Sequence, residues 1–196
     1  LFRMFKIKGM PPLVIINVFS CFVQNTYMIF IANYVTNEYS FSLGGAIVLS
    51  SLFLGLLIGR TLFSLLADKI PVFKTMAVSN AVAFLCFTGI FLCHSLALTA
   101  VLICMGCSFT AMNFPALILE SHKLVPDDVS AASSLIYIGL AIAILVIVPA
   151  ISWAGDQLGL RLALLITATG QIPVVLIAAG SVKHFGLPPG QTVKIK

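Results

Sequence analysis

Residues 59–74 read G-R-T-L-F-S-L-L-A-D-K-I-P-V-F-K, an apolar run that ends in an Asp-Lys pair and a short basic turn. The run carries one cation, Arg60, and reaches its first carboxylate only at Asp68. Pro71 follows, and a helix rarely continues through a proline. An apolar helix that ends at charged residues is typical of a membrane span, because charges are costly in hydrocarbon. The stretch therefore predicts a transmembrane helix and the turn that follows it.

The composition of the whole chain agrees with membrane insertion. Of the 196 residues, 60% are hydrophobic and 9% are charged, and the mean hydropathy is +1.14. An ordinary soluble domain has about 25% charged residues. The net charge of +5 does not favour nucleic acid, because the basic residues are scattered singly at the ends of apolar runs. We predict an integral, multi-pass membrane protein that binds the lipid bilayer and no nucleic acid.

Six apolar runs are long enough to cross a hydrocarbon core of about 30 Å at about 1.5 Å per helical residue. We place these spans at residues 12–35, 41–67, 75–93, 96–119, 129–153 and 160–182. Pro115 is expected to kink the fourth span. Residues 155–159 are expected to turn the chain, and residues 120–128 form the longest internal loop. The predicted fold class is an all-α integral membrane protein with six transmembrane helices.

The distribution of Lys and Arg predicts the orientation of these spans. One side of the six-span arrangement has Arg161. The other side collects Arg3, Lys6, Lys8, Lys69, Lys74, Lys123, Lys183, Lys194 and Lys196. Because short loops rich in Lys and Arg stay on the cytoplasmic side, both termini are expected to be cytoplasmic. A bacterial inner membrane or a plasma membrane is the expected location.

A turn pattern occurs twice, each time at the end of the second span in a group of three. Each copy has a serine four residues before an aspartate, followed by a turn residue and a cation. The copies are Ser64, Asp68, Pro71 and Lys74, and Ser152, Asp156, Gly159 and Arg161. Because three is an odd number of spans, the two turns lie on opposite sides of the membrane, as in an inverted-topology repeat. The predicted segments are a cytoplasmic start (1–11), two repeats (12–93 and 94–185) and a cytoplasmic tail (186–196).

With these turns, the sequence resembles the C-terminal six-helix half of a major facilitator superfamily transporter. The first turn is similar to the family's loop motif G-x-L-A-D-R-x-G-R-R, with Ser64 and Pro71 at glycine positions and L-A-D-K at residues 66–69. The second, residues 153–161, is similar to the family's outer turn G-x-x-x-D-x-x-G-x-R. The stretch M-N-F-P at residues 112–115 is also similar to the M-F-P-T stretch of fucose/proton-symporter-type members.

The resemblance implies a secondary active or facilitative carrier that moves a small polar solute by alternating access. This chain would form one half, working with or without a coupling proton or sodium ion. The second half is expected in the same polypeptide, in a separate subunit or in a second copy. Because the chain starts with Leu, we expect a piece of a longer polypeptide. The alternative is a non-transporting six-span scaffold or remnant that binds a partner protein.

No enzyme, cofactor or metal is expected. Ser, His and acidic residues do not converge in a recognisable catalytic pattern. The pair Cys104-x-x-Cys107 lies in an apolar run without a second pair or a nearby His, which does not indicate a metal site.

The resemblance also implies that the first and fourth spans line the substrate path, where polar side chains are the candidates for solute contact. The candidates are Asn17, Gln24 and Asn25 on the first span, Ser108 and Asn113 on the fourth, and Tyr137 on the fifth. A second interpretation stays open, in which these side chains hydrogen-bond neighbouring helices.

The charged residues at span ends are candidates for gating or a conformational latch. They are Arg60, Asp68, Lys69, Lys74, Asp156 and Arg161. Arg60 is either a counter-ion for an anionic substrate or a gate or structural pair with Asp68 or another acidic group. Asp127 and Asp128 are expected to cap the fifth span. A proton-titrating acid is expected in the partner half, unless Glu120 lies deeper than a span end.

Overall fold

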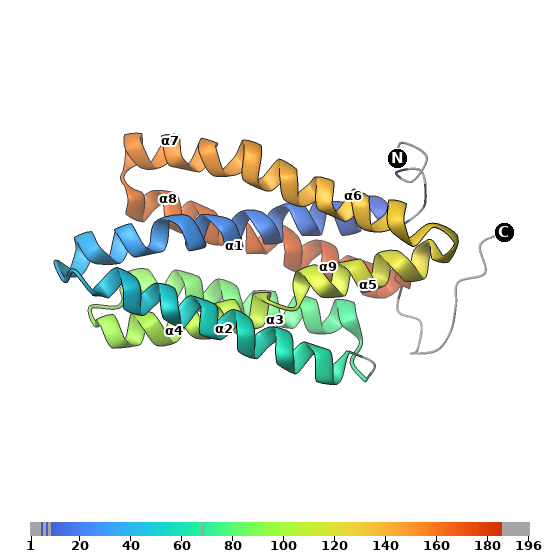
Figure 1. Ribbon diagram of the computed structural model, residues 1–196, viewed down its shortest axis with the longest axis horizontal. Helices are drawn as coiled ribbons and strands as arrows, with labels where there is room; N and C mark the ends of the chain where they lie inside the picture. Colours follow the sequence, from blue (N-terminus) through green and yellow to red (C-terminus); the bar gives the residue numbers. More distant parts are fainter. Residues whose placement is uncertain (1–4, 6, 8, 68, 186–196) are drawn as a thin grey trace.

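The computed structural model describes residues 5, 7, 9–67 and 69–185 of the chain. These residues form a bundle of helices without strands, and six helical spans are long and apolar enough to cross a membrane (Figure 1). The elements are α1 (Met10–Tyr39), α2 (Gly44–Leu66), α3 (Val72–Gly89), η2 (Ile90–Leu92), α4 (Leu96–Thr110), α5 (Asn113–Leu124), η3 (Pro126–Asp128), α6 (Val129–Ile142), η4 (Ala143–Ile147), α7 (Val148–Leu158), α8 (Leu160–Thr169) and α9 (Gln171–Phe185). The predicted all-α class and its six spans are confirmed.

The two ends of the bundle are named here after the ends of α1. The Met10 end holds the start of α1 and the end of α2, and the Tyr39 end holds the end of α1 and the start of α2 (Figure 1). The predicted tail 186–196, most of residues 1–8 and Asp68 lie outside the described residues.

The fourth, fifth and sixth spans are each irregular just before a proline. Each irregularity contains or adjoins the residue four positions before the proline. The α4–α5 break does so for Pro115, the π-helical turn η4 for Pro149 and the α8–α9 break for Pro173. A proline has no N–H to donate to that residue, and its ring clashes with that residue's carbonyl group. The irregularity expected from Pro115 is therefore present as a break between α4 and α5, on the N-terminal side of the proline.

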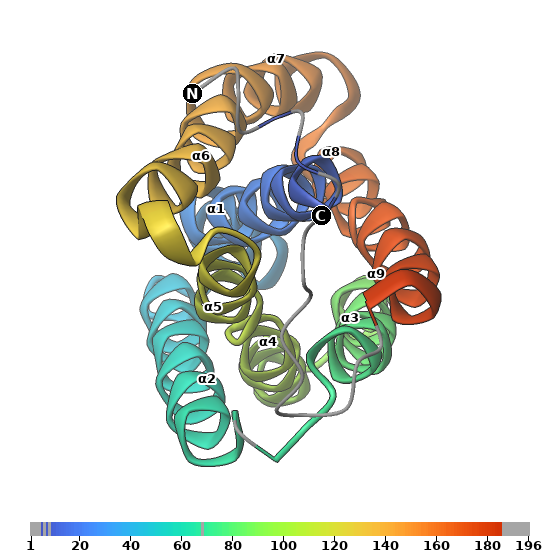
Figure 2. The ribbon, with the colours of Figure 1, turned by 90° about the vertical axis from the view of Figure 1, so that its right-hand side faces the viewer.

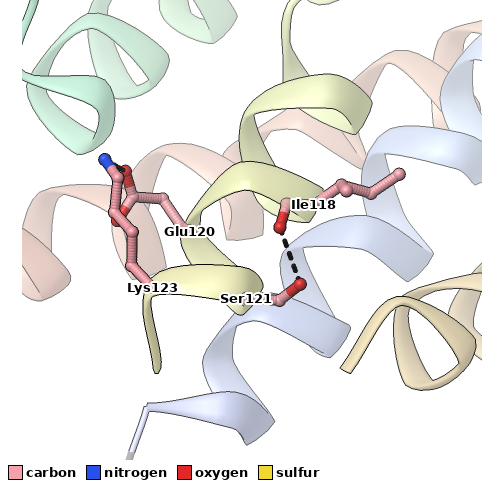
Figure 3. Close-up of polar contacts among 4 residues, drawn as sticks. All are labelled: Ile118, Glu120, Ser121 and Lys123. Carbon is pink, nitrogen blue, oxygen red and sulfur yellow. Dashed lines mark hydrogen bonds and ion pairs between the residues drawn. The ribbon is translucent and has the colours of Figure 1, made fainter. Parts of the chain in front are cut away.

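Two predicted connections are shorter than expected. Helix α5 continues to Leu124, so residues 120–123 are helical rather than part of a loop. Lys123 Nζ binds Glu120 Oε1 at 2.7 Å, and an ion pair with this spacing supports a helix (Figure 3). Helix α7 likewise continues to Leu158. The chain then reverses at Gly159, whose φ of 87° is a conformation that glycine adopts without strain.

Close backbone approaches hold the spans together. Gly55 and Gly59 of α2 form a G-x-x-x-G pattern, and a Cβ on either would overlap the carbonyl oxygen of Cys104 or Ser108 on α4. Gly139 of α6 lies less closely against α1, with 3.3 Å between a Cβ built on the glycine and the carbonyl oxygen of Val14. Viewed along the bundle, α1, α5 and α4 form the middle, with α2 and α6 on one side and α3 and α9 on the other (Figure 2).

Candidate functional site

The middle of α1 carries two half-buried amides. Gln24 and Asn25 are the central pair of this 30-residue helix, which runs from Met10 to Tyr39. Asn25 Nδ2 donates to its own helix at Cys21 O, 2.8 Å away. Within the described part of the chain, Asn25 Oδ1 and the Gln24 amide have no hydrogen-bond partner. The side-chain amides at the centre of this membrane span therefore carry hydrogen-bonding groups that no described residue engages.

The neighbouring helices leave this central stretch of α1 partly open. At the Met10 half of α1, Gly139 of α6 lies against Asn17, with 3.1 Å between a Cβ built on the glycine and Asn17 Nδ2. At the Tyr39 half, Gly45 of α2 lies against Ala32, with 3.0 Å between a Cβ built on the glycine and the carbonyl oxygen of Ala32. Between these two contacts, Met28 and Ile29 are exposed. The central amides thus lie beside an exposed stretch of α1, while the π-helical turn η4 of the fifth span also packs against this helix.

Asn17, the third candidate on α1, is fully buried and bonded at both ends of its amide. Asn17 Nδ2 donates to Ile136 O on α6 at 2.7 Å, and Cys21 Sγ donates to Asn17 Oδ1 at 3.3 Å. In this conformation, Asn17 joins α1 to α6.

Asn113, at the start of α5, belongs to a buried polar network that joins three spans. Its Nδ2 donates to Ser20 Oγ of α1 at 3.0 Å and to Asn80 Oδ1 of α3 at 2.7 Å. Asn80 Nδ2 donates back to Asn113 Oδ1 at 3.0 Å. Sequence reasoning missed Asn80, although an amide in the middle of an apolar span signals a buried partner.

The remaining candidates on the fourth and fifth spans differ in exposure. Ser108 Oγ donates to Cys104 O of its own helix at 2.8 Å, at the place where Gly59 of α2 packs. Tyr137 of α6 is 51% exposed, and its ring meets the ring of Phe114 edge-on at a centroid distance of 5.4 Å. Tyr137 therefore lies at the surface of this six-span bundle.

Arg60 is exposed on α2, about 9 Å along the helix from Leu66 at about 1.5 Å per residue. Among the described residues it has no ion-pair partner. Its predicted partner Asp68 lies outside them, so both interpretations of Arg60 stay open. Lys69 and Lys74 are exposed on either side of the turn that leads into α3.

At the Tyr39 end, the two candidates Asp156 and Arg161 do not pair with each other. Arg161 Nη2 donates to Phe91 O at 2.8 Å, which ties the start of α8 to the end of the third span. Tyr39 Oη donates to Cys93 O at 3.2 Å in the same region. Asp156 is exposed on α7 and has no hydrogen-bond or ion-pair partner among the described residues.

At the Met10 end, Glu120 and Asp128 are engaged locally, whereas Asp127 has no hydrogen-bond or ion-pair partner among the described residues, so the cap expected from Asp127 is not seen. Glu120 has a side chain that is 16% exposed and pairs with Lys123, and the adjacent Ser121 Oγ donates to Ile118 O (Figure 3). Asp128 Oδ1 accepts a hydrogen bond from Ala131 N at 3.0 Å, so its predicted role as a cap of the fifth span is confirmed. Over the described ranges, no group of three His, Cys, Asp or Glu side chains is arranged to hold a metal ion.

A comparison with models of protein families identifies the family of this chain. Residues 13–190 match the model of the Major Facilitator Superfamily. No curated protein matches the chain significantly. Since the match extends over most of the 196 residues and the six spans agree with it, this chain belongs to the Major Facilitator Superfamily, a family of membrane transporters.

Proposed function

We propose that this chain is one half of an alternating-access carrier for a small polar solute, and that Gln24 and Asn25 contact the solute. The observation that carries the proposal is the position of these two amides at the centre of α1, with hydrogen-bonding groups that no described residue engages. An amide without a partner at the depth of the hydrocarbon costs free energy, and a polar solute would supply the missing hydrogen bonds.

The packing of the spans supports two inverted three-helix repeats, residues 12–93 and 94–185. Packed pairs between the two repeats include α2 with α4, α1 with α6, α3 with α4, α1 with α8 and α9, and α3 with α9. If each span of the first repeat is exchanged for the corresponding span of the second, the α2–α4 pair becomes the α6–α1 pair. The α3–α9 pair maps onto itself. Carriers built from such repeats bind solute near the bilayer midplane, where the central amides of α1 stand.

The face that carries α2 and the fifth span is proposed to meet the second half of the carrier. These are the least buried spans, with 33% and 28% of their most apolar windows buried inside the bundle. Arg60 and Tyr137 are exposed on them, and a charged side chain in a span is costly against lipid. The second half would cover Arg60, and it would supply the proton-titrating group if transport is coupled to protons.

The first experiment measures the intact mass of the natural polypeptide in its membrane. A mass near twice the 20.9 kDa of this chain places both halves in one polypeptide. A mass near 20.9 kDa calls for cross-linking, which identifies a second copy or a separate subunit. The complete assembly is then purified and screened for thermal stabilisation by sugars, amino acids, carboxylates and amines, and solutes that stabilise it are used in uptake assays with proteoliposomes.

The decisive comparison uses Gln24→Leu and Asn25→Leu, which keep the size of the side chain and remove its hydrogen bonds. We expect each to lower uptake at least about tenfold, which corresponds to a loss of about 1.4 kcal/mol of interaction. The matched control is Thr169→Val, because Thr169 is exposed on the sixth span and its hydroxyl group bonds only to Ile166 O of its own helix. Uptake that survives both leucine variants would contradict the proposed contact. A complete assembly that retains a partner protein but shows no flux under any solute, proton or sodium gradient would instead indicate a scaffold.

A further inference from the structure

A polar cavity of about 360 Å³ lies at the Tyr39 end, between α1, α7 and the start of α8. The lining residues that matter for binding are Phe30, Asn33, Thr36 and Asn37 of α1, and Ser152 and Asp156 of α7. Asn33 lies eight residues beyond Asn25, which is about 12 Å along the helix. The cavity is therefore separate from the central amides.

The polar side chains around this cavity have their hydrogen-bonding groups available. The side chains of the two asparagines, of Thr36 and Ser152 and of Asp156 make no hydrogen bond to any described residue, although Thr36 Oγ1 also packs against Gly45 of α2. Hydroxyl groups elsewhere on the spans commonly bond to their own helix, as Ser134 does to Ser130 O and Thr167 does to Ala163 O. Polar groups from two helices thus converge on one space without binding each other.

The charge of the cavity is negative. Asp156 is the charged residue in its lining. The nearest cation along the chain, Arg161, donates to Phe91 O and does not line the cavity. An anionic ligand would be repelled by the carboxylate of Asp156, and a neutral polyol would gain no charge attraction from it. The electrostatics therefore favour a cation.

The size of the cavity indicates an organic cation rather than a bare metal ion. A single metal ion would leave most of this cavity of about 360 Å³ to water, and over the described residues no group of three His, Cys, Asp or Glu side chains is arranged to hold one. The amide and hydroxyl oxygens suit the N–H donors of an ammonium group. Phe30 adds an aromatic ring, which attracts cations through its π-electrons.

We propose that this cavity binds a small protonated amine that also carries hydroxyl groups. The ammonium group pairs with Asp156 and the hydroxyl groups bond to Asn33 and Asn37. This site goes beyond the proposed carrier function, because binding here requires neither solute at Gln24 nor movement of one half against the other.

Binding is measured by isothermal titration calorimetry on the complete natural protein in lipid nanodiscs, in phosphate buffer, because Tris is itself a hydroxylated amine. The probes are ethanolamine, ethylene glycol and glycolate, which are small hydroxylated molecules that are cationic, neutral and anionic. We expect ethanolamine to bind and the other two to give no detectable heat. Asp156→Asn should weaken ethanolamine binding at least about tenfold, the effect of losing about 1.4 kcal/mol.

The matched control is Asp127→Asn, which makes the same charge change at an exposed carboxylate of the Met10 end. It should leave ethanolamine binding unchanged, and an equal loss would overturn the proposal in favour of general charge attraction. Asn37→Ala is a second test within the cavity and should weaken binding severalfold, with thermal unfolding of each variant checked without ligand. The proposal would be overturned if Asp156→Asn bound ethanolamine as tightly as the unmodified protein. It would also be overturned if ethylene glycol bound as tightly as ethanolamine, or if sodium chloride gave binding heat and ethanolamine gave none.

Discussion

Asn80 and Asn113 exchange a reciprocal pair of side-chain hydrogen bonds, with donor–acceptor distances of 3.0 and 2.7 Å. Asn80 comes from α3 and Asn113 from α5, and both side chains are buried. Asn80 Nδ2 also donates to Met76 O, and Asn113 Nδ2 also donates to Ser20 Oγ. The pair therefore ties three spans together where apolar side chains would give no directional contact.

We expect Asn80→Leu to destabilise the bundle by about 1 kcal/mol, because it leaves Asn113 Oδ1 without its donor and Asn113 Nδ2 with Ser20 Oγ as its remaining acceptor. The measurement is reversible unfolding of the protein by sodium dodecyl sulfate in mixed micelles. The double variant Asn80→Leu/Asn113→Leu should lose less than the sum of the two single variants, since no orphaned amide remains. Additive losses would show that the two amides are not coupled.

The close approach of α2 to α4 predicts that even one methyl group at Gly59 is harmful. A Cβ there would overlap Ser108 O and stand 2.7 Å from the Ala111 Cβ, so the backbones would have to move apart. We expect Gly59→Ala to destabilise the protein by about 1–3 kcal/mol in the same unfolding assay. The matched control is Gly180→Ala, because a Cβ at Gly180 has no atom within 4 Å. A neutral Gly59→Ala would mean that α2 and α4 are farther apart than described here.

Much of the fold could be predicted because it depends on local sequence. Apolar length determines the spans, and prolines determine where the last three are irregular. The extension of α5 to Leu124 was missed, since polar residues such as Glu120 and Lys123 are typical of loops unless they pair on one helical face. The partners of buried amides could not be predicted, because they depend on how each helix is rotated about its axis. Asn113 bonds to Asn80, 33 residues away, and Asn17 bonds to Ile136, 119 residues away. For the same reason, the sequence could not show that Asn17 is buried and bonded to α6, whereas Gln24 is half-buried without a described partner.

The hydrogen bond from Arg161 to Phe91 O predicts a local role for this arginine. The bond satisfies a carbonyl group near the end of the third span, where a helix leaves its last carbonyls without partners. We expect Arg161→Gln to increase hydrogen–deuterium exchange of backbone amides in residues 91–95 by at least about fivefold, the effect of losing about 1 kcal/mol. Arg60→Gln is the matched control and should leave exchange in these residues unchanged. Unaltered exchange in Arg161→Gln would mean that the guanidinium group does not hold this end of the span.

The orientation expected from the Lys and Arg distribution can be tested at two exposed positions on opposite ends of the bundle. His94 lies in the link between the third and fourth spans at the Tyr39 end, and Asp127 lies between the fourth and fifth spans at the Met10 end. Because most of the cations outside the spans belong to the Met10 side, that side should be cytoplasmic. In a parent whose five cysteines are replaced by alanine, we expect His94→Cys to react in intact cells with a membrane-impermeant maleimide. Asp127→Cys should react only after the cells are permeabilised. The reverse pattern would place Arg161, Asp156 and the cavity beside them on the cytoplasmic side, where an amine in the external medium could not reach them directly.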